Sequence, residues 1–159
     1  MVREIDSVLN SPDPNFELII FYDQSPNNID KGISDERVRH LTNPHNLGLV
    51  ETANTAMKIV HGERLSFINS DDVYILKFLE TLYQAEAEES VDIEVIAYVL
   101  ATVNEDGTKR TPHRKQPETY ESKSVMLRLM RERIISYPCN KIFRKEHFTN
   151  LKSPLINRV

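Results

Sequence analysis

Two groups of acidic side chains follow directly after apolar runs of the sequence. Asn69-Ser70-Asp71-Asp72 comes after the mainly apolar residues 65–68, and Asp23 comes after the near-continuous apolar run 16–22. A carboxylate on a tight turn after a buried strand is held rigidly enough to bind a hard divalent cation such as Mg²⁺ or Mn²⁺. In α/β sheets, ligands bind beyond the carboxyl ends of the strands. Both groups are therefore candidates for a ligand-binding site.

The apolar pattern predicts the elements that position these side chains. Near-continuous apolar runs predict strands over residues 16–22 and 65–68, and a shorter strand is expected over residues 38–42. Apolar positions with a helical period predict a helix over residues 49–60, which Gly62 is expected to end as a left-handed C′ residue.

The same reading extends to the rest of the chain. The further expected elements, in order, are a helix over 75–87, a long strand over 91–103, a hairpin turn at Asn104-Glu105-Asp106-Gly107, a loop over 109–119 and a helix over 122–133. Strands that alternate with helices predict an α/β fold with a mostly parallel sheet flanked by helices. The 159 residues suffice for one domain, so residues 1–159 are predicted to form a single domain.

Composition narrows the class of protein. The formal net charge of −4 argues against a nucleic-acid binder that works by bulk electrostatics. The single cysteine, Cys139, cannot form an intrachain disulfide, and no apolar run approaches the roughly 20 residues that span a bilayer. These features predict a cytoplasmic protein without a transmembrane segment, and attachment to the inner membrane face through a partner stays open.

Each candidate residue also has a plainer structural interpretation. Asp71 and Asp72 could cap the helix expected over residues 75–87, because aspartate accepts hydrogen bonds from free N–H groups at a helix start. Asp23 could simply stabilise its own turn. Lys141 and Arg144 either face a phosphate group or lie on the surface. A second basic cluster is interpreted as a solvated loop and comprises Lys109, Arg110, His113, Arg114 and Lys115.

The run from Gly62 to Asp72 resembles the signature GEYI-x-F-L-D-S-D-D of the family 2 glycosyltransferases. Other segments are similar to further elements of that family, in the same order. They are Ser7-Val8-Leu9 with residues 16–20 (S-V-L then E-I-I-V-V-D-D-G-S), Asn46-Leu47-Gly48 with Ala53-Asn54 (N-x-G then A-x-N), and Asn140-Lys141-Ile142-Phe143-Arg144 (N-K-L-F-R). The resemblance covers nearly the whole chain.

The resemblance implies a GT-A fold and the transfer of a sugar from a nucleotide-diphosphate donor to an acceptor hydroxyl. Synthesis of a cell-surface polysaccharide or glycan is the implied process, with a saccharide or a lipid-linked acceptor. It further implies that Asp71 binds a divalent cation, Mg²⁺ or Mn²⁺, that bridges the donor diphosphate. By the same resemblance, Asp23, Asn69 and Ser70 contact the nucleotide, and Asp72 supports the turn.

The chain departs from the family pattern at several positions. Asn69 stands where the family has the first aspartate of its D-x-D motif, Tyr22 replaces the aspartate before Asp23, and Gln24 replaces a glycine. The family's first strand, V-S-V-I-I-P-x-Y-N, and its downstream E-D catalytic base are not found in residues 1–159. We therefore expect a domain truncated at both ends, with unpaired strand edges that favour self-association and without glycosyl transfer of its own.

Two other functions stay open. One is a catalytically inactive remnant that acts as a nucleotide-binding or interaction module. The other is a nucleotidyltransferase-like protein, which would share the metal and the α/β sheet. The four glycines of the chain do not cluster, so the glycine-rich phosphate loop that many such enzymes use is absent. No residue can be assigned as the catalytic base.

Overall fold

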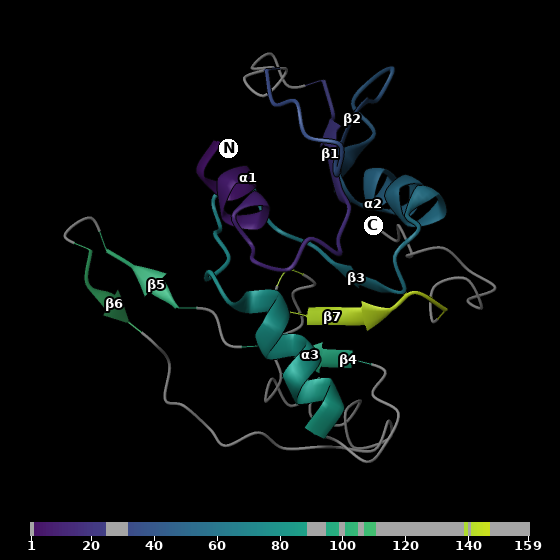
Figure 1. Cartoon of the computed structure of the whole chain (residues 1–159). Coiled ribbons are helices and arrows are strands. Elements are labelled where there is room, and N and C mark those ends of the chain that lie inside the picture. Colours follow the sequence, from purple (N-terminus) through teal and green to yellow (C-terminus); the bar gives the residue numbers. More distant parts are fainter. Residues whose placement is uncertain are drawn as a thin grey trace, which may run out of the picture.

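The structure is a computed structural model that describes residues 2–24, 32–88, 95–98, 101–104, 107–110, 139 and 141–146. Its elements, in chain order, are α1 (Val2–Leu9), β1 (Leu18–Tyr22), β2 (Val38–Thr42), α2 (Gly48–Ile59), β3 (Arg64–Ser66), α3 (Phe78–Glu88), β4 (Val95–Ala97), β5 (Thr102–Val103), β6 (Lys109–Arg110) and β7 (Lys141–Arg144). Helices and strands are interspersed along the first part of the chain, where only β1 and β2 follow each other directly, and this agrees with the α/β prediction (Figure 1).

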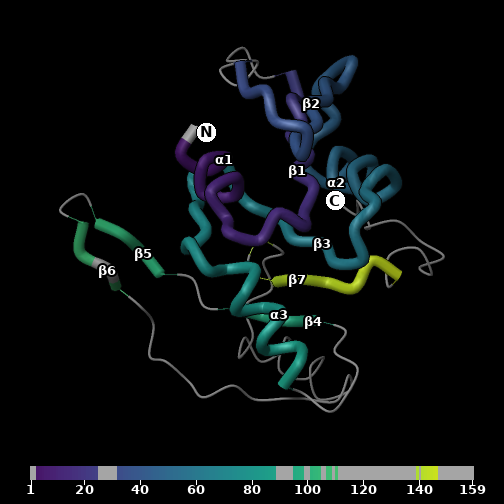
Figure 2. The backbone as a smooth tube through the Cα atoms, viewed as in Figure 1, coloured from purple at the N-terminus to yellow at the C-terminus, as the bar shows by residue number. Residues whose placement is uncertain are grey.

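The strands form three small sheets. β1 and β2 pair in parallel, from Leu18 opposite Val38 to Tyr22 opposite Thr42. β7 lies between β3 and β4 and is antiparallel to both, and β5 and β6 form an antiparallel hairpin. The backbone trace shows β1 and β2 in the upper part of the view and β3, β7 and β4 below them (Figure 2). The expected parallel pairing is therefore found between β1 and β2.

Two groups of apolar side chains hold the helices against these sheets. Ile5 of α1 is buried with Ile20 and Tyr22 of β1. On the second sheet, Phe78 of α3 is buried, as are Leu65 and Ile142. Burying one large apolar side chain contributes about 1.5–3 kcal/mol. The two groups thus fix α1 on β1, and they place the start of α3 close to β3 and β7.

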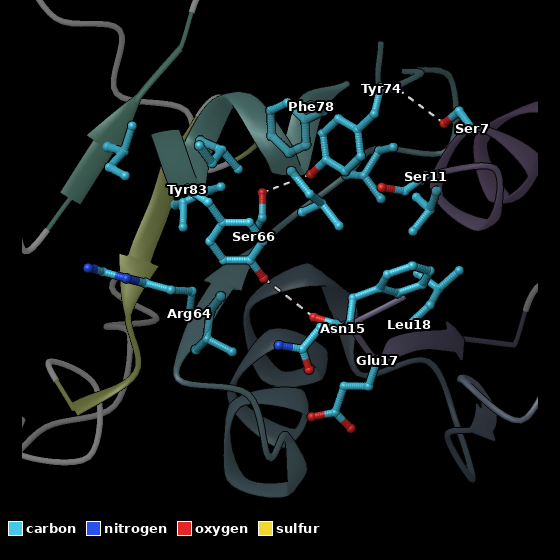
Figure 3. A pocket seen from close by; sticks show the side chains of 18 of the residues that line it. Ser7, Ser11, Asn15, Glu17, Leu18, Arg64, Ser66, Tyr74, Phe78 and Tyr83 are labelled. Carbon is cyan, nitrogen blue, oxygen red and sulfur yellow. Dashed lines mark hydrogen bonds between the residues drawn. The ribbon is translucent and has the colours of Figure 1, made fainter. Parts of the chain in front are cut away.

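A cavity of about 170 Å³ lies between these two groups, with α1, β3 and α3 around it (Figure 3). Its lining is mainly apolar and includes Leu18, Leu65, Tyr74 and Phe78. An apolar cavity of this size is large enough for a small hydrocarbon and leaves the lining side chains without contacts on one face.

Several sequence predictions need correction. The long strand expected over residues 91–103 is wrong, because β4 ends at Ala97 and pairs with β7, whereas β5 begins at Thr102 and pairs with β6. The helix expected over residues 75–87 is α3, and it begins at Phe78 rather than at residue 75. The loop predicted from Lys109 starts instead with the strand β6. The helix expected over residues 122–133 lies outside the described residues.

The predicted hairpin turn is confirmed. Gly107 has φ +79°, which glycine adopts without a steric cost, and it follows an aspartate as the Asp-Gly signal requires. The N–H of Gly107 donates to the carbonyl of Asn104 at 2.9 Å, and the N–H of Asn104 donates to the carbonyl of Thr108 at 2.9 Å. Local turn chemistry was sufficient to predict this element.

The end of α2 differs from the prediction. The helix ends at Ile59, and the following residue, Val60, has an extended backbone with φ −68° and ψ 145°. Gly62 is not among the glycines with positive φ in the part of the chain that the structure describes, so its assignment as a left-handed C′ residue is wrong. The segment is held instead by a side chain that precedes β1.

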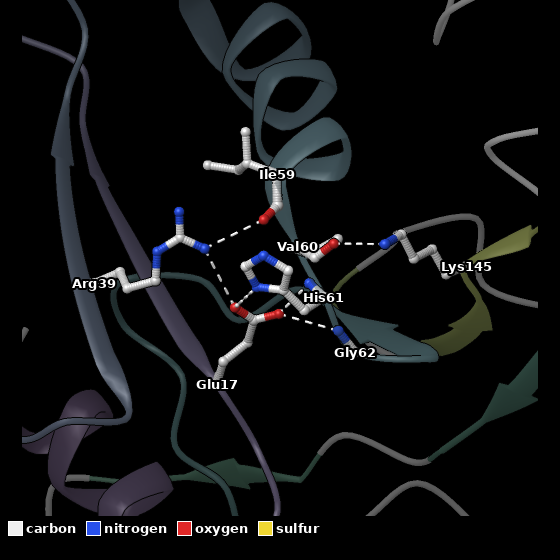
Figure 4. A network of polar contacts seen from close by, with 7 residues as sticks. All are labelled: Glu17, Arg39, Ile59, Val60, His61, Gly62 and Lys145. Atoms are coloured by element: carbon white, nitrogen blue, oxygen red, sulfur yellow. Dashed lines mark hydrogen bonds and ion pairs between the residues drawn. The ribbon is translucent and has the colours of Figure 1, made fainter.

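Glu17 is that side chain (Figure 4). One of its carboxylate oxygens accepts hydrogen bonds from the backbone N–H groups of His61 and Gly62, the latter at 3.0 Å. The other oxygen lies 3.4 Å from Nη1 of Arg39 and 3.2 Å from Nδ1 of His61. Glu17 therefore connects the start of β1 with β2 and with the segment that leads into β3. We call this set of contacts the Glu17 clamp.

Two positively charged side chains, those of Arg39 and Lys145, also hold the end of α2. Arg39 of β2 also donates to the carbonyl of Ile59 at 3.2 Å, and Nζ of Lys145 donates to the carbonyl of Val60 at 2.5 Å. The last carbonyls of a helix have no partner within the helix and carry partial negative charge, so cations stabilise them. The end of α2 is thus held by residues that adjoin both sheets.

The charge state of Glu17 is adapted to this role. Partial burial raises the pKa of Glu17, but the N–H groups of His61 and Gly62 and the His61 side chain outweigh it and lower the pKa below 4.5.

No helix within the described ranges has the length and apolar content needed to cross a membrane.

We predict that Glu17→Gln lowers the free energy of unfolding by about 1 kcal/mol at pH 7, because the amide retains one acceptor and loses the charge. Since the folded pKa of Glu17 is depressed, its contribution exists above pH 4.5 and disappears as the pH falls through the lowered pKa. Urea unfolding of both proteins between pH 7 and pH 3 measures this difference. Glu51→Gln, an exposed position on α2, is the control. A difference that stays constant with pH would contradict the prediction.

Candidate functional site

The acidic turn follows β3 and is closed by two hydrogen bonds. The N–H of Asp72 donates to the carbonyl of Asn69 at 3.2 Å, and Nδ2 of Asn69 donates to Oδ2 of Asp72 at 2.8 Å. Ser70 and Asp71 form the tip, and both are exposed. The Asp71 carboxylate makes no hydrogen bond or ion pair with the part of the chain that the structure describes, so it is open to a ligand.

The capping alternative for this turn is wrong. α3 begins at Phe78, whose N–H donates to the carbonyl of Ile75, and Asp71 and Asp72 lie well before that turn. An N-cap side chain must sit directly at the helix start, where it accepts from the second or third N–H of the helix. The acidic turn is therefore a separate structure between β3 and α3.

The turn alone does not make a cage for a metal ion. Within the described residues, no three His, Cys, Asp or Glu side chains gather closely enough to hold one. Mg²⁺ commonly binds through one or two protein carboxylates, several waters and the phosphates of its substrate. The exposed carboxylate of Asp71 fits that second kind of site, in which the ligand supplies most of the remaining oxygens.

Asp23 occupies a different environment, at the end of β1. Its Oδ1 accepts hydrogen bonds from the N–H of Leu47 at 2.8 Å and from Nδ2 of Asn43 at 2.9 Å, and its Oδ2 accepts from the N–H of Gly48 at 2.8 Å. Leu47 and Gly48 are the start of α2, which has no cap from its own side chains. Asp23 therefore caps α2 from a neighbouring strand.

These donors set the charge of Asp23. The N–H of Leu47 and the side chain of Asn43 lower its pKa below 3.8, with a further contribution from the N–H of Gly48. A carboxylate offers about four acceptor positions, and three are used here. One position on Oδ2 is left for a further donor.

Asn43 is a functional candidate that the sequence patterns did not single out. It is buried at 4% exposure, and its Nδ2 donates to Asp23 and, at 2.7 Å, to Oγ1 of Thr52 in α2. Its own N–H donates to the carbonyl of Tyr22 at 3.0 Å. The one sequence signal was a polar residue at the end of a strand. Asn43 fixes the orientation of Asp23.

Tyr22 explains one departure from the family pattern. Its side chain is 2% exposed, and its hydroxyl lies 3.0 Å from Nδ1 of His40 on β2. The position that holds an aspartate in the family thus faces the core in this protein. The acidic side chain at the end of β1 is therefore that of Asp23, and not that of the preceding residue.

The basic residues near the end of the chain lie on β7 or just after it. Lys141 is buried, and burial lowers its pKa, so the surface alternative is wrong for this residue. Arg144 lies 3.9 Å from Glu86 and 3.6 Å from Glu146. Cys139 is buried. Of the basic cluster, Arg110 is exposed at the end of β6, and residues 113–115 lie outside the described ranges.

The structure therefore groups the predicted site residues in two places. Asn69, Ser70, Asp71 and Asp72 share one turn after β3, whereas Asp23 joins Asn43 and the start of α2. In the described parts of the chain, no hydrogen bond or ion pair joins Asp23 to the acidic turn. A ligand that uses both groups must extend from one strand end to the other.

Comparison with known proteins agrees with the family resemblance of the sequence motifs. A family model described as Glycosyl transferase family 2 matches residues 2–151. A UDP-Glc:alpha-D-GlcNAc-diphosphoundecaprenol beta-1,3-glucosyltransferase of Escherichia coli is 37% identical over 79 residues, which are 48% of this chain and 31% of that protein. An uncharacterized glycosyltransferase of Methanocaldococcus jannaschii is 25% identical over 153 residues, 90% of this chain and 52% of that protein.

A third relative is glycosyltransferase GlyG of Streptococcus pneumoniae, 27% identical over 103 residues, which are 62% of this chain and 34% of that protein. The chain thus spans 31% to 52% of the length of these three relatives. The matched residues 2–151 include both candidate groups, the end of β1 and the turn after β3.

We predict that the carboxyl group of Asp23 titrates below pH 3.8 and that the amide signals of Leu47 and Gly48 move with it in NMR spectra. Because the folded pKa is depressed, the cap stabilises α2 above that range and is lost as the pH falls through it. Asp23→Asn should abolish the titration of both amides. Asp71→Asn, in the acidic turn, should leave it unchanged. A midpoint at or above 3.8 would show that the cap does not form.

Proposed function

This chain belongs to family 2 of the glycosyltransferases, and from that premise we propose that it binds a nucleotide-diphosphate sugar through a divalent cation at Asp71. The proposed reaction is transfer of the sugar to an acceptor hydroxyl. The observation that carries the proposal is the exposed carboxylate of Asp71 at the tip of a turn that Asn69 and Asp72 hold closed.

The proposed roles follow from the hydrogen bonds that each side chain already makes. Asn69 donates its amide N–H to Asp72, which leaves its amide oxygen as an acceptor for a ribose hydroxyl. The exposed hydroxyl of Ser70 is a second contact for the nucleotide. Asp72 supports the turn through its two bonds to Asn69.

Asp23 is the proposed contact for the nucleotide base. Its free acceptor position suits an N–H group of the base, and its three existing bonds hold it still. A side chain that is already fixed loses little conformational entropy on binding. Asn43 and the start of α2 thus supply the rigidity that this contact needs.

The proposed cofactor is Mg²⁺ or Mn²⁺. Such a cation neutralises charge that develops on the leaving diphosphate. The acceptor oxygen would form a bond to the anomeric carbon as the bond from that carbon to the diphosphate breaks, and the hydroxyl proton would pass to a base. The described residues offer no side chain that we assign as this base.

The proposed acceptor is a saccharide or a lipid-linked saccharide in the synthesis of a cell-surface polysaccharide. The name of the Escherichia coli relative, which includes a GlcNAc-diphosphoundecaprenol, supports that class. We propose a cytoplasmic location with peripheral contact to the inner membrane face, supported by the single cysteine and by the lipid-linked class of acceptor.

We predict that a nucleoside diphosphate binds this chain only when a divalent cation is present. Isothermal titration with UDP, GDP, ADP and dTDP, each with Mn²⁺ and with a chelator, measures the difference. The cation bridges two anionic groups that would otherwise repel each other, so the chelator should remove the binding. Equal binding in both conditions, or none in either, would rule the proposal out.

We predict that Asp71→Ala weakens cation-dependent binding about 10- to 100-fold or more, because a ligand of the cation is removed. The melting temperature should hardly change, because the side chain is exposed and has no partner in the described ranges. Asp6→Ala, an exposed aspartate on α1, is the matched control and should alter neither quantity. A fall in stability with an unchanged response to Mn²⁺ would give Asp71 a structural role instead.

A further inference from the structure

The loop that carries the acidic turn is closed at its base by a hydrogen bond between two hydroxyl groups. β3 ends at Ser66, and its Oγ lies 2.8 Å from the hydroxyl oxygen of Tyr74 (Figure 3). The acidic turn lies between these two residues in the chain. We call this contact the Ser66–Tyr74 bridge.

Both ends of the bridge are anchored elsewhere. The ring of Tyr74 stacks on Phe78 at the start of α3, with centroids 4.0 Å apart and planes 10° apart. The N–H of Tyr74 donates to Oγ of Ser7 in α1 at 3.0 Å. Ser66 also donates to the carbonyl of Lys141 in β7 at 3.2 Å. The bridge therefore ties the loop to two helices and the central strand of a sheet.

The Ser66–Tyr74 bridge lies beside the cavity, where packing contacts alone would not hold the loop in one position. Ile68, Tyr74 and Ile75, which flank the acidic turn in the chain, all line that cavity of about 170 Å³. A side chain next to a void lacks packing contacts on that face, so packing alone leaves it room to move. Burial raises the pKa of Tyr74, so its hydroxyl keeps its proton through the neutral range.

We propose that Ser66 and Tyr74 are positioning residues for the cation site: their bridge holds the acidic turn so that Asp71 meets its ligand in one geometry. The inference rests on the proposed role of Asp71. That carboxylate has no bond of its own within the described ranges, so its position follows from the turn. The turn itself is held by the Ser66–Tyr74 bridge, which closes its loop. A metal ligand that is displaced by a fraction of an ångström binds less well.

The test is Tyr74→Phe, which removes the hydroxyl and keeps the ring stacked on Phe78. Ser66 keeps its bond to Lys141, so no buried hydroxyl loses its last partner. We expect the Asp72 amide, whose N–H bonds to Asn69, to exchange its hydrogen about 2- to 10-fold faster in NMR experiments. Binding of UDP with Mn²⁺ should weaken by about 2- to 10-fold, with little change in melting temperature.

Tyr83→Phe is the matched control. Tyr83 lines the same cavity, but its hydroxyl contacts the carbonyl of Asn15 at 3.5 Å, away from the acidic turn. Ser66→Ala and the double variant complete a mutant cycle, in which the effect of Tyr74→Phe should be smaller once Ser66 is gone. An equal effect of Tyr74→Phe in both backgrounds, or an equal effect of Tyr83→Phe, would overturn the proposal.

Amide exchange separates this proposal from the proposed function. If the unaltered chain does not bind UDP with Mn²⁺, the proposed function fails, and exchange at Asp72 still decides whether the bridge holds the turn. Unchanged exchange in Tyr74→Phe overturns the proposal whatever the binding result. Faster exchange with unchanged UDP and Mn²⁺ binding shows that the bridge does not position Asp71, and this also overturns it.

Discussion

The Glu17 clamp is the contact on which the relation between the two main sheets depends. In the described residues no strand pair joins β1 and β2 to β3, β7 and β4. Glu17, which leads into β1, binds the N–H groups of His61 and Gly62, which lead into β3. Arg39 of β2 adds a carbonyl of α2 to the same cluster. The two strand ends that carry Asp23 and the acidic turn thus keep their spacing through a carboxylate that remains charged at neutral pH.

Features set by neighbouring residues could be predicted from the sequence. β2 has the predicted bounds, α2 is shifted by one residue, and the Asp-Gly hairpin forms where its turn chemistry indicated. The acidic turn begins at Asn69, shortly after β3 ends at Ser66, as its position behind an apolar run implied. Helical period, apolar runs and turn residues are local signals, and each of these elements needs only its own segment.

Features set by distant residues could not be predicted. The end of α2 is held by Glu17, far back in the chain, and not by the glycine that follows the helix. The apolar run after α3 was expected to be one strand, but β4 and β5 have different partners, so it divides. α1 was overlooked because its residues were interpreted only as part of a motif. Asn43 and Tyr74 matter through contacts with other elements, which a pattern of spacing does not reveal.

Asn69 shows what the charge of a single side chain would do to the proposed cation site. Its amide N–H lies 2.8 Å from Oδ2 of Asp72. An aspartate in its place would set two like charges side by side, and such a turn would need a cation to bring them together. With the amide, the turn closes by itself, and binding pays no energy to assemble it. In the proposed site, the attraction for a cation would be weaker by one charge, whereas the closed turn would already have its binding geometry. The proposed site would therefore favour a cation that arrives with its diphosphate over a cation alone.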